Sequence, residues 1–386
     1  MTAPLVDVDP ISFIEEIEEA YIERHGASPV HLSHWDPARA YREVLNSALR
    51  LPRGEDAFRY WFTYEMQELK SAVGQRLALT PGSGVRLFTN SSTVSTIAVV
   101  HWLRNVGVRR MVILAPFYFS VLRACDALGV ACEIVPLTRH FDGDSTRYRI
   151  PTQLPIGDGD CLWVTNPVYS SGGYISGARD ELSSIADGTF VVLDETLSDS
   201  SLGLAQTLSS NSRIVALHSP HKGLNINGVK FSCVIGTEDC QDHLDQWSDV
   251  LTGGLAASAV TAIRHFLSPN FETCCKEFRS FTRVAHLRLR QICNSSGAAR
   301  FDDWESGNFV ACYSPLIDGG IGFSSERMND LVEKTASIVF PTACSFADPA
   351  WGFGFRLNLT RFDQQFSAAF RRLVSYLSRR PAALGR

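Results

Sequence analysis

The sequence predicts an α/β fold that has a large domain with a mostly parallel sheet and a small α+β domain. Between about residues 85 and 236, short β-branched or apolar runs alternate with amphipathic stretches, which is typical of βαβ units. After residue 253 long helical patterns dominate, and apolar strands return only at 308–313 and 355–360. A chain of 386 residues is long enough for two packed cores.

The individual elements follow from these patterns. Amphipathic stretches at 95–106 and 121–129 predict helices between the strands. We expect the strands at 111–115, 131–137, 160–165, 189–194, 213–219 and 230–236. The expected division is an N-terminal segment that joins the small domain, a large domain, and a connecting helix with the small domain, at 1–50, 51–265 and 266–386. Ligands of such sheets bind where the strands end, so the residues after each run are the first candidates for a site.

Composition excludes several classes of partner. The net charge of -5 and the pI near 6.1 give no basic field, so neither nucleic acid nor an anionic membrane is the expected partner. No apolar run is long enough to span a bilayer, and the N-terminus is acidic where a signal peptide would be basic. The ten cysteines include no CxxC motif, so we expect reduced thiols and no metal site. A cytoplasmic protein with a small-molecule substrate is predicted.

Two strands end in residues that can carry chemistry. Asp194 closes the run VVLD, where a carboxylate needs a cation or hydrogen-bond donors. Lys222 follows the run RIVALHS in an apolar loop, where burial would lower its pKa and make it nucleophilic toward an aldehyde. Ser219, three residues earlier, and Lys230, eight residues later, suit a phosphate. A salt-bridged aspartate and a surface lysine are the structural alternatives.

Other candidates surround this pair. The hydroxyls of Ser91, Ser92 and Thr93 open a helix whose N-terminal amides could cradle phosphate, although simple N-capping also explains them. Tyr118 follows a strand and could stack on a planar ring, or could pack in the core. The amide of Asn166 could donate to a phenolic oxygen, and a turn containing proline explains Asn166 equally well.

Three residues are candidates for binding a substrate. Arg356 lies in a late strand, and its forked guanidinium suits a carboxylate, although an ordinary salt bridge is the alternative. Tyr169 follows the Asn-Pro pair at 166–167. His34 belongs to the segment HLSHWDP, which either lines the pocket or forms a surface turn.

The order of these residues resembles that of the class I/II aminotransferases, the fold-type I enzymes that use pyridoxal 5'-phosphate (PLP), over about residues 85–360. Asn166 precedes Asp194 by 28 residues, and Lys222 follows Asp194 by another 28. The resemblance implies the aspartate-aminotransferase fold and PLP as cofactor. It implies Lys222 as the Schiff-base lysine and general acid/base, Asp194 at the pyridine nitrogen and Asn166 at the phenolic oxygen.

The same resemblance implies roles for the remaining candidates. Tyr118 would stack on the ring, and Arg356 would bind the substrate carboxylate. Four residues would bind the phosphate, namely Ser91, Ser92, Ser219 and Lys230. Tyr60 would correspond to the tyrosine that reaches the phosphate of a neighbouring subunit, so a homodimer with active sites at the interface is expected.

Departures from the family pattern suggest unusual chemistry. The expected Asn-Pro-Thr-Gly is Asn-Pro-Val-Tyr at 166–169, and the tyrosine expected three residues after Asp194 is Leu197. The expected phosphate-binding arginine is Lys230, although only five of the 36 basic residues are lysines. These changes resemble the PLP-dependent arginine oxidases of natural-product pathways, and they favour oxidation, elimination or cyclisation of an amino acid.

Several other functions were weighed. An ordinary amino-acid aminotransferase is the main alternative, and a non-catalytic aminotransferase-like binding protein is the second. Retention of both Lys222 and Asp194 argues against lost catalysis. A nucleotide-binding Rossmann protein is disfavoured because no GxGxxG motif follows the early strands.

Overall fold

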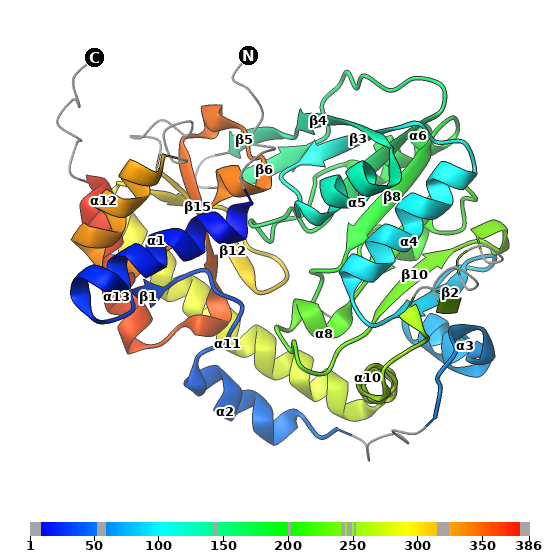
Figure 1. The fold of residues 1–386 in the computed structure, drawn as a ribbon, viewed down its shortest axis with the longest axis horizontal. Coiled ribbons are helices and arrows are strands. Elements are labelled where there is room, and N and C mark those ends of the chain that lie inside the picture. Colours follow the sequence, from blue (N-terminus) through cyan, green and yellow to red (C-terminus); the bar gives the residue numbers. More distant parts are fainter. Residues whose placement is uncertain are drawn as a thin grey trace.

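The computed structural model describes residues 9–51, 59–142, 145–199, 202–240, 244, 249–250, 252–314 and 324–378. Within them, a seven-stranded sheet forms the centre of the larger part of the molecule and a four-stranded sheet that of the smaller part (Figure 1). The larger sheet has the order β2-β10-β9-β8-β7-β3-β4, in which β10 alone runs in the direction opposite to the other six strands. Its strands are β2 (Gly84–Thr89), β3 (Arg110–Ala115), β4 (Ala131–Pro136), β7 (Asp160–Thr165), β8 (Phe190–Glu195), β9 (Ile214–His218) and β10 (Ser232–Gly236).

The predicted α/β fold with a mostly parallel sheet is confirmed, and each of the six predicted strands is present to within two residues at either end. They were recognisable because helices cover the sheet on both faces, so its strands are continuously apolar. Successive residues of a strand point to opposite faces, so Met111 and Val112 belong to different apolar layers. One layer includes α4 (Ser92–Asn105) and α5 (Ser120–Leu128), and the other includes α3 (Gln67–Arg76), α6 (Ala178–Ala186) and α10 (Ala257–Leu267).

One helix start agrees with the expectation, and one hairpin was not expected. The helix that contains the amphipathic stretch 95–106 begins at Ser92, within the hydroxyl-rich segment expected to open it, and the side chain of Ser91 caps it by accepting a hydrogen bond from the backbone N–H of Val94 at 3.4 Å. The hairpin of β5 (Thr138–Asp142) and β6 (Ser145–Arg149) was not predicted. Its strand sequences, TRHFD and STRYR, are too polar to give an apolar or alternating signal.

The smaller sheet is antiparallel in the order β11-β12-β15-β14. Its strands are β11 (Arg300–Phe301), β12 (Phe309–Ser314), β14 (Phe340–Pro341) and β15 (Phe353–Asn358). The helices that share its core are α1 (Pro10–His25), α11 (Pro269–Ser296), α12 (Ser325–Thr335) and α13 (Gln364–Ser378). The N-terminal helix α1 therefore packs with C-terminal elements, far from it in sequence.

Helix α11 contributes to both cores. Phe271 and Phe278, near its start, pack in the core of the larger sheet, whereas Leu289 and Cys293, near its end, pack in that of the smaller one. Helix α2 (Arg39–Ala48) packs with the larger core, although it falls in the expected N-terminal segment. The boundaries at residues 50 and 265 remain a prediction.

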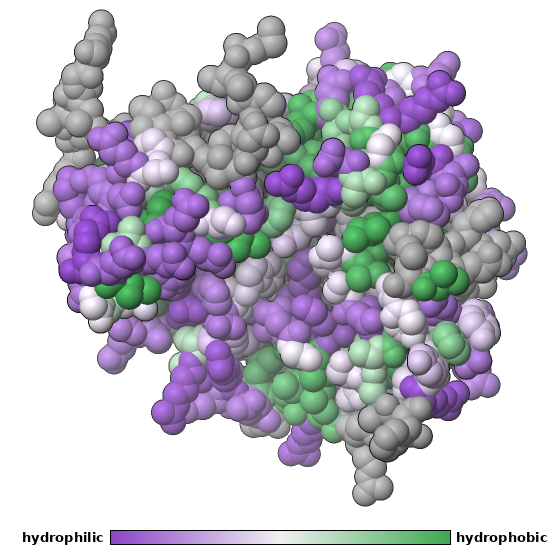
Figure 2. All heavy atoms as spheres, in the orientation of Figure 1, coloured by the Kyte–Doolittle hydropathy of each residue, from purple (hydrophilic) through white to green (hydrophobic). Residues whose placement is uncertain are grey.

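The surface drawn in Figure 2 is mixed. Hydrophobic residues form small separate groups among hydrophilic ones on this face. In the part of the chain that the structure describes, no helix has both the length and the apolar character needed to cross a membrane.

A buried ion pair joins the two parts of the molecule. Arg139 of β5 lies 2.6 Å from Asp302, which follows β11, and their side chains are 1% and 0% exposed. Tyr148 of β6 donates a hydrogen bond to the same carboxylate, and the guanidinium of Arg139 lies 3.9 Å from the ring centroid of Tyr313. The unpredicted hairpin therefore carries one buried polar contact between the smaller sheet and the larger part.

We predict that Asp302→Ala lowers the free energy of unfolding by about 3–5 kcal/mol, because it leaves the guanidinium of Arg139 buried without its counter-charge. Denaturant unfolding followed by circular dichroism measures the change. Glu43→Ala is the matched control, since its ion pair with Arg39 is exposed and should contribute less than about 1 kcal/mol. Equal effects of the two substitutions would contradict the prediction.

Candidate active site

Lys222 lies in the four-residue helix α8 (Pro220–Gly223), directly after β9. Its Nζ donates a hydrogen bond to Ser92 Oγ at 2.8 Å, and lies 5.3 Å from the ring centroid of Tyr118 and 5.8 Å from that of Trp35. Burial lowers the pKa of Lys222 to about 8, although the nearby carboxylate of Asp194 acts in the opposite direction. A lysine with such a pKa is partly neutral near pH 7 and can act as a nucleophile.

Three cations of this region have no carboxylate partner in the part of the chain that the structure describes. Among the described residues, no ion pair involves Lys222, Lys230 or Arg356. The positive charges of Lys230 and Arg356 are close enough to lower the pKa of Lys222 further. A cluster of cations without counter-charges is unfavourable by itself and favours the binding of an anionic ligand.

Arg356 is the most enclosed of the three, with only 5% of its surface exposed. Its guanidinium donates to the hydroxyl of Tyr169 at 2.5 Å, and its Nε has no hydrogen-bond partner among the described residues. The guanidinium carbon lies 4.1 Å from the ring centroid of Phe340 and 4.4 Å from that of Phe309. A buried guanidinium held by rings rather than carboxylates is suited to a carboxylate brought by a ligand.

Asp194 is held at the end of β8, 6% exposed. One of its oxygens, Oδ1, accepts hydrogen bonds from the backbone N–H of Thr196 at 3.1 Å and from the Thr196 hydroxyl at 2.7 Å. The other oxygen accepts none from the described residues. The turn explains how the carboxylate is oriented, and the free oxygen leaves it able to bind a protonated nitrogen.

Asn166 and Ser219 lie at the predicted edge, but protein groups already engage them. Asn166 Oδ1 accepts from the backbone N–H of Ile175 at 3.0 Å, and the amide also donates to Glu195, whose pKa burial raises to about 7. One N–H of the Asn166 amide remains available to a ligand. The hydroxyl of Ser219 donates to the carbonyl of Phe231 at 2.8 Å, so its proton is not available to a phosphate.

The N-terminus of α4 lies beside Lys222. Ser92 is buried and accepts the hydrogen bond from Lys222, Ser91 caps the helix, and Thr93 is exposed. The first backbone N–H groups of a 14-residue helix carry partial positive charge and favour an anion. This end of the site therefore combines helix amides with two lysine charges.

A cavity of about 320 Å³ adjoins Arg356. Tyr118 and Trp35, whose rings flank the Nζ of Lys222, also line it, so the cavity is next to the lysine. The remaining lining comes from α1, from residues 31–34, from the residue before α5 and from residues 338–340. It comprises Ile11, Ile14, Glu15, Glu18, His31, Ser33, His34, Phe119, Ile338, Val339 and Phe340.

His34 thus lines the cavity as a half-exposed residue, and its Nδ1 accepts from the backbone N–H of Asp36 at 3.1 Å. Glu15 and Glu18 of α1 were not predicted. A signal for them exists in the helix period, because Ile11, Ile14, Glu15 and Glu18 form a stripe distinct from the buried face of α1.

The apolar wall beside Arg356 contains Leu197, which stands where a tyrosine was expected from the sequence. Leu197, 5% exposed, packs with Tyr169 and Phe309, and Tyr118 and Trp35 pack against this group. The rings of Tyr169 and Tyr118 are 5.7 Å apart, and burial raises the pKa of Tyr169 to about 12. Leu197 therefore brings no hydrogen-bonding group of its own to this wall.

Tyr60 is placed differently from the other candidates. It is 71% exposed, and its ring stacks on Phe62 with centroids 5.6 Å apart. Its predicted contact with a neighbouring subunit stays a prediction. Among the described residues, no group of three or more His, Cys, Asp or Glu side chains could hold a metal ion.

No protein-family model matches this sequence, and no curated protein matches it either. Solved structures do match. A protein from Escherichia coli with a methionine aminotransferase function has a TM-score of 0.73 at 18% identity, over 96% of this chain and 100% of that one. A double mutant of Thermus thermophilus aspartate aminotransferase has a TM-score of 0.72 at 14% identity, over 95% and 96%.

A kynurenine aminotransferase from Pyrococcus horikoshii, solved in complex with PMP, has a TM-score of 0.70 at 14% identity over 94% of both chains. These similarities extend over nearly the whole of each chain, and they include both sheets and the helices between them. The chain therefore has the fold of the aspartate aminotransferases.

Proposed function

We propose that this protein is a PLP-dependent enzyme that acts on a free α-amino acid, with amino-group transfer as its reaction. The observation that carries the proposal is the convergence of Lys222, Lys230 and Arg356, none of which has a carboxylate partner among the described residues, near the half-free carboxylate of Asp194. A phosphate, a protonated ring nitrogen and a substrate carboxylate would together supply the missing partners.

The residues present fit this cofactor. Lys222 would hold its aldehyde, and the free oxygen of Asp194 would face its protonated ring nitrogen. Tyr118 would stack on the ring, while Lys230 and the first amides of α4 would bind the phosphate. When bound, PLP supplies a sink for the electrons released from a bond at the α-carbon of the amino acid.

The remaining steps belong to the side chains. Arg356 would bind the substrate carboxylate, and its bond to Tyr169 would keep the guanidinium in place. Lys222, with a pKa of about 8, would accept and return the α-proton near neutral pH. The rings of Tyr118 and Trp35 would limit the access of water to the Nζ of Lys222.

The names of the similar structures support amino-group transfer, since these proteins are aminotransferases. A second candidate is the oxidation, elimination or cyclisation of an amino acid in natural-product metabolism, and Leu197 favours it because the apolar wall lacks a phenol at that position. Incubation with amino acids separates them. Release of a keto acid that requires an amino acceptor supports transfer, whereas consumption of oxygen without an acceptor supports the second candidate.

The cavity beside Arg356 supports a substrate with a cationic side chain. Glu18 forms an ion pair with His31 at 2.8 Å, whereas Glu15 forms none with the described residues. An amino acid whose carboxylate meets Arg356 could extend between apolar walls toward these two carboxylates. The proposal also includes a homodimer, in which the exposed Tyr60 of each subunit reaches the phosphate of the other.

The purified protein is predicted to carry PLP and to show the visible absorption band of the lysine-bound cofactor. Lys222→Ala should abolish the band because no other amine lies at this position, whereas Lys276→Ala, at an exposed position on α11, should retain it. Absorption spectra after incubation with PLP measure both. A wild-type protein that stays colourless would overturn the proposed function.

A second prediction concerns the pH dependence of Lys222. Because burial lowers its pKa from 10.5 to about 8, its neutral form becomes predominant above about pH 8. Reductive methylation of the cofactor-free protein, followed by mass spectrometry, should therefore show the reaction of Lys222 levelling off above that pH. The exposed Lys276 is the internal control. Identical pH profiles for the two lysines would contradict the prediction.

A third prediction tests the substrate class. Glu15→Gln should raise KM for lysine or arginine about fivefold, the magnitude of a partly exposed ion pair, and should change KM for methionine less than twofold. Glu16→Gln is the control, because Glu16 is on the same helix and does not line the cavity. Steady-state kinetics with the three amino acids measure the effect. A preference for methionine unaffected by Glu15→Gln would exclude the cationic class and leave the proposed reaction intact.

A further inference from the structure

Two buried histidine side chains, one from the residue that precedes Lys222, contact each other. His221, the residue before Lys222, places its Nε2 3.0 Å from Nδ1 of His265 in α10, and both residues are 0% exposed. The remaining ring nitrogens, His221 Nδ1 and His265 Nε2, have no hydrogen-bond partner in the part of the chain that the structure describes. Within that part, the hydrogen bond of each ring is therefore to the other ring.

The surroundings keep this pair neutral. Burial lowers the pKa of His221 to about 3, and burial also lowers the pKa of His265. The ring of Phe271 lies 5.2 Å from that of His221 and 5.6 Å from that of His265, and Phe231 is 5.9 Å from His221. A single N–H is thus shared between two uncharged rings in an apolar environment, where a hydrogen bond is strong and directional.

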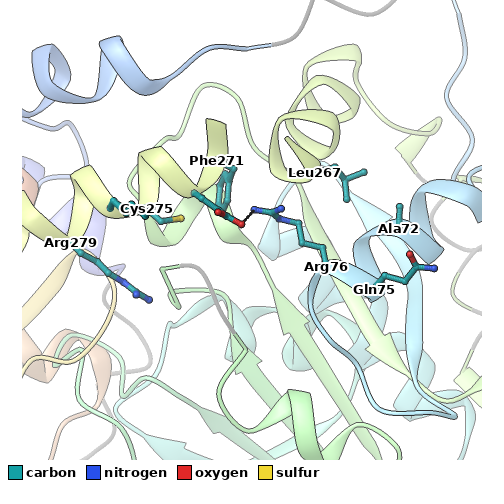
Figure 3. A pocket seen from close by; sticks show the side chains of 9 residues that line it. Ala72, Gln75, Arg76, Leu267, Phe271, Cys275 and Arg279 are labelled. Atoms are coloured by element: carbon teal, nitrogen blue, oxygen red, sulfur yellow. Dashed lines mark ion pairs between the residues drawn. The ribbon is translucent and has the colours of Figure 1, made fainter. Parts of the chain in front are cut away.

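Phe271 separates the pair from solvent. It also lines a surface groove of about 740 Å³ between α3, α10 and α11, in which Arg76 lies close to it (Figure 3). The guanidinium of Arg76 is 6.0 Å from the ring centroid of Phe271 and 3.5 Å from the carboxylate of Glu272. Phe271 therefore contacts both the groove and the two imidazoles, neither of which lines the groove.

The position of the pair gives it a mechanical consequence. Helix α8 has four residues and no side-chain cap, so it cannot hold its own orientation. On one side Gly223 touches the backbone of Ser198, since a Cβ built there would lie 2.0 Å from that carbonyl oxygen. On the other side, His221 is tied to His265. The helix that carries Lys222 is thus held from two sides.

We propose that the His221–His265 hydrogen bond is a positioning contact that fixes α8, and with it the Nζ of Lys222 next to Ser92. The inference rests on the proposed function for its catalytic consequence. Because neither histidine lines the cavity beside Arg356 and their rings are hydrogen-bonded to each other, the contact acts on the rate of proton movement by Lys222 rather than on substrate binding.

The test compares two amide replacements of His265 in the holoenzyme. Asparagine places its amide near the position of the imidazole Nδ1, whereas glutamine places it near that of Nε2. His265→Asn should therefore keep the bond to His221, and His265→Gln should lose it. We expect kcat to fall about tenfold in His265→Gln and less than threefold in His265→Asn, with KM within twofold of wild type in both.

Two readouts besides activity belong to this test. In His265→Gln, the pH titration of the visible band of the lysine-bound cofactor should shift by about half a pH unit or more, because the position of Nζ changes. Hydrogen exchange of the amides of residues 219–226 should be faster in His265→Gln than in His265→Asn. This exchange is measurable with or without the cofactor.

His286→Gln is the matched control for the removal of a buried histidine. His286 is 8% exposed and packs between Phe301 and Trp304 in the core of the smaller sheet, away from α8. The His286→Gln variant should have a lower free energy of unfolding, with no change in kcat or in the pH titration of the visible band. Equal kcat values, titrations and exchange rates for His265→Gln and His265→Asn would overturn the positioning contact. A wild-type protein without PLP would instead overturn the proposed function, and the exchange comparison would still decide whether the contact holds α8.

Discussion

A guanidinium buried away from carboxylates is stable only if other groups share its charge, and the surroundings of Arg356 are arranged to meet that requirement. The rings of Phe340 and Phe309 face it, and Tyr169 gives it an acceptor. These contacts come from β14, β12 and the turn after β7, so both sheets take part. The arrangement leaves Nε without a partner, and a ligand carboxylate is the simplest group that completes it.

This requirement makes the joint between the two parts of the molecule important for the site. Lys222 and Asp194 end strands or follow strands of the larger sheet, whereas Arg356 belongs to the smaller one. The buried contact of Arg139 with Asp302 is one of several polar contacts between the two parts, among which is also that of Asn225 with Thr360. The relative position of Arg356 and Lys222 therefore rests partly on residues that touch neither, and the polar hairpin β5–β6 has a role that its sequence does not reveal.

The parts of the site that were predictable are those determined by local sequence. Lys222 and Asp194 directly follow continuous apolar runs, and such runs end at the same edge of a parallel sheet, so their proximity follows from the pattern alone. His265 and Glu15 belong to helices, and their partners depend on how α10 and α1 pack against other elements. No local period determines that packing, so the imidazole pair and the acidic rim of the cavity required the structure.

The hydrogen bonds within the protein also determine which groups the candidate site can offer to a ligand. Ser219 and one side of the Asn166 amide are engaged by neighbouring protein groups, and Leu197 offers no donor. Among the described residues, the charged groups of the site that lack an ion-pair partner are Lys230 and Arg356, and one oxygen of Asp194 accepts no hydrogen bond. The neutral donors that remain include one N–H of the Asn166 amide and the first amides of α4. Under the proposed function such a site would select a ligand mainly by the position of its charges, and because Lys230 carries a compact ammonium rather than a planar fork, it would impose little further geometry on an anion.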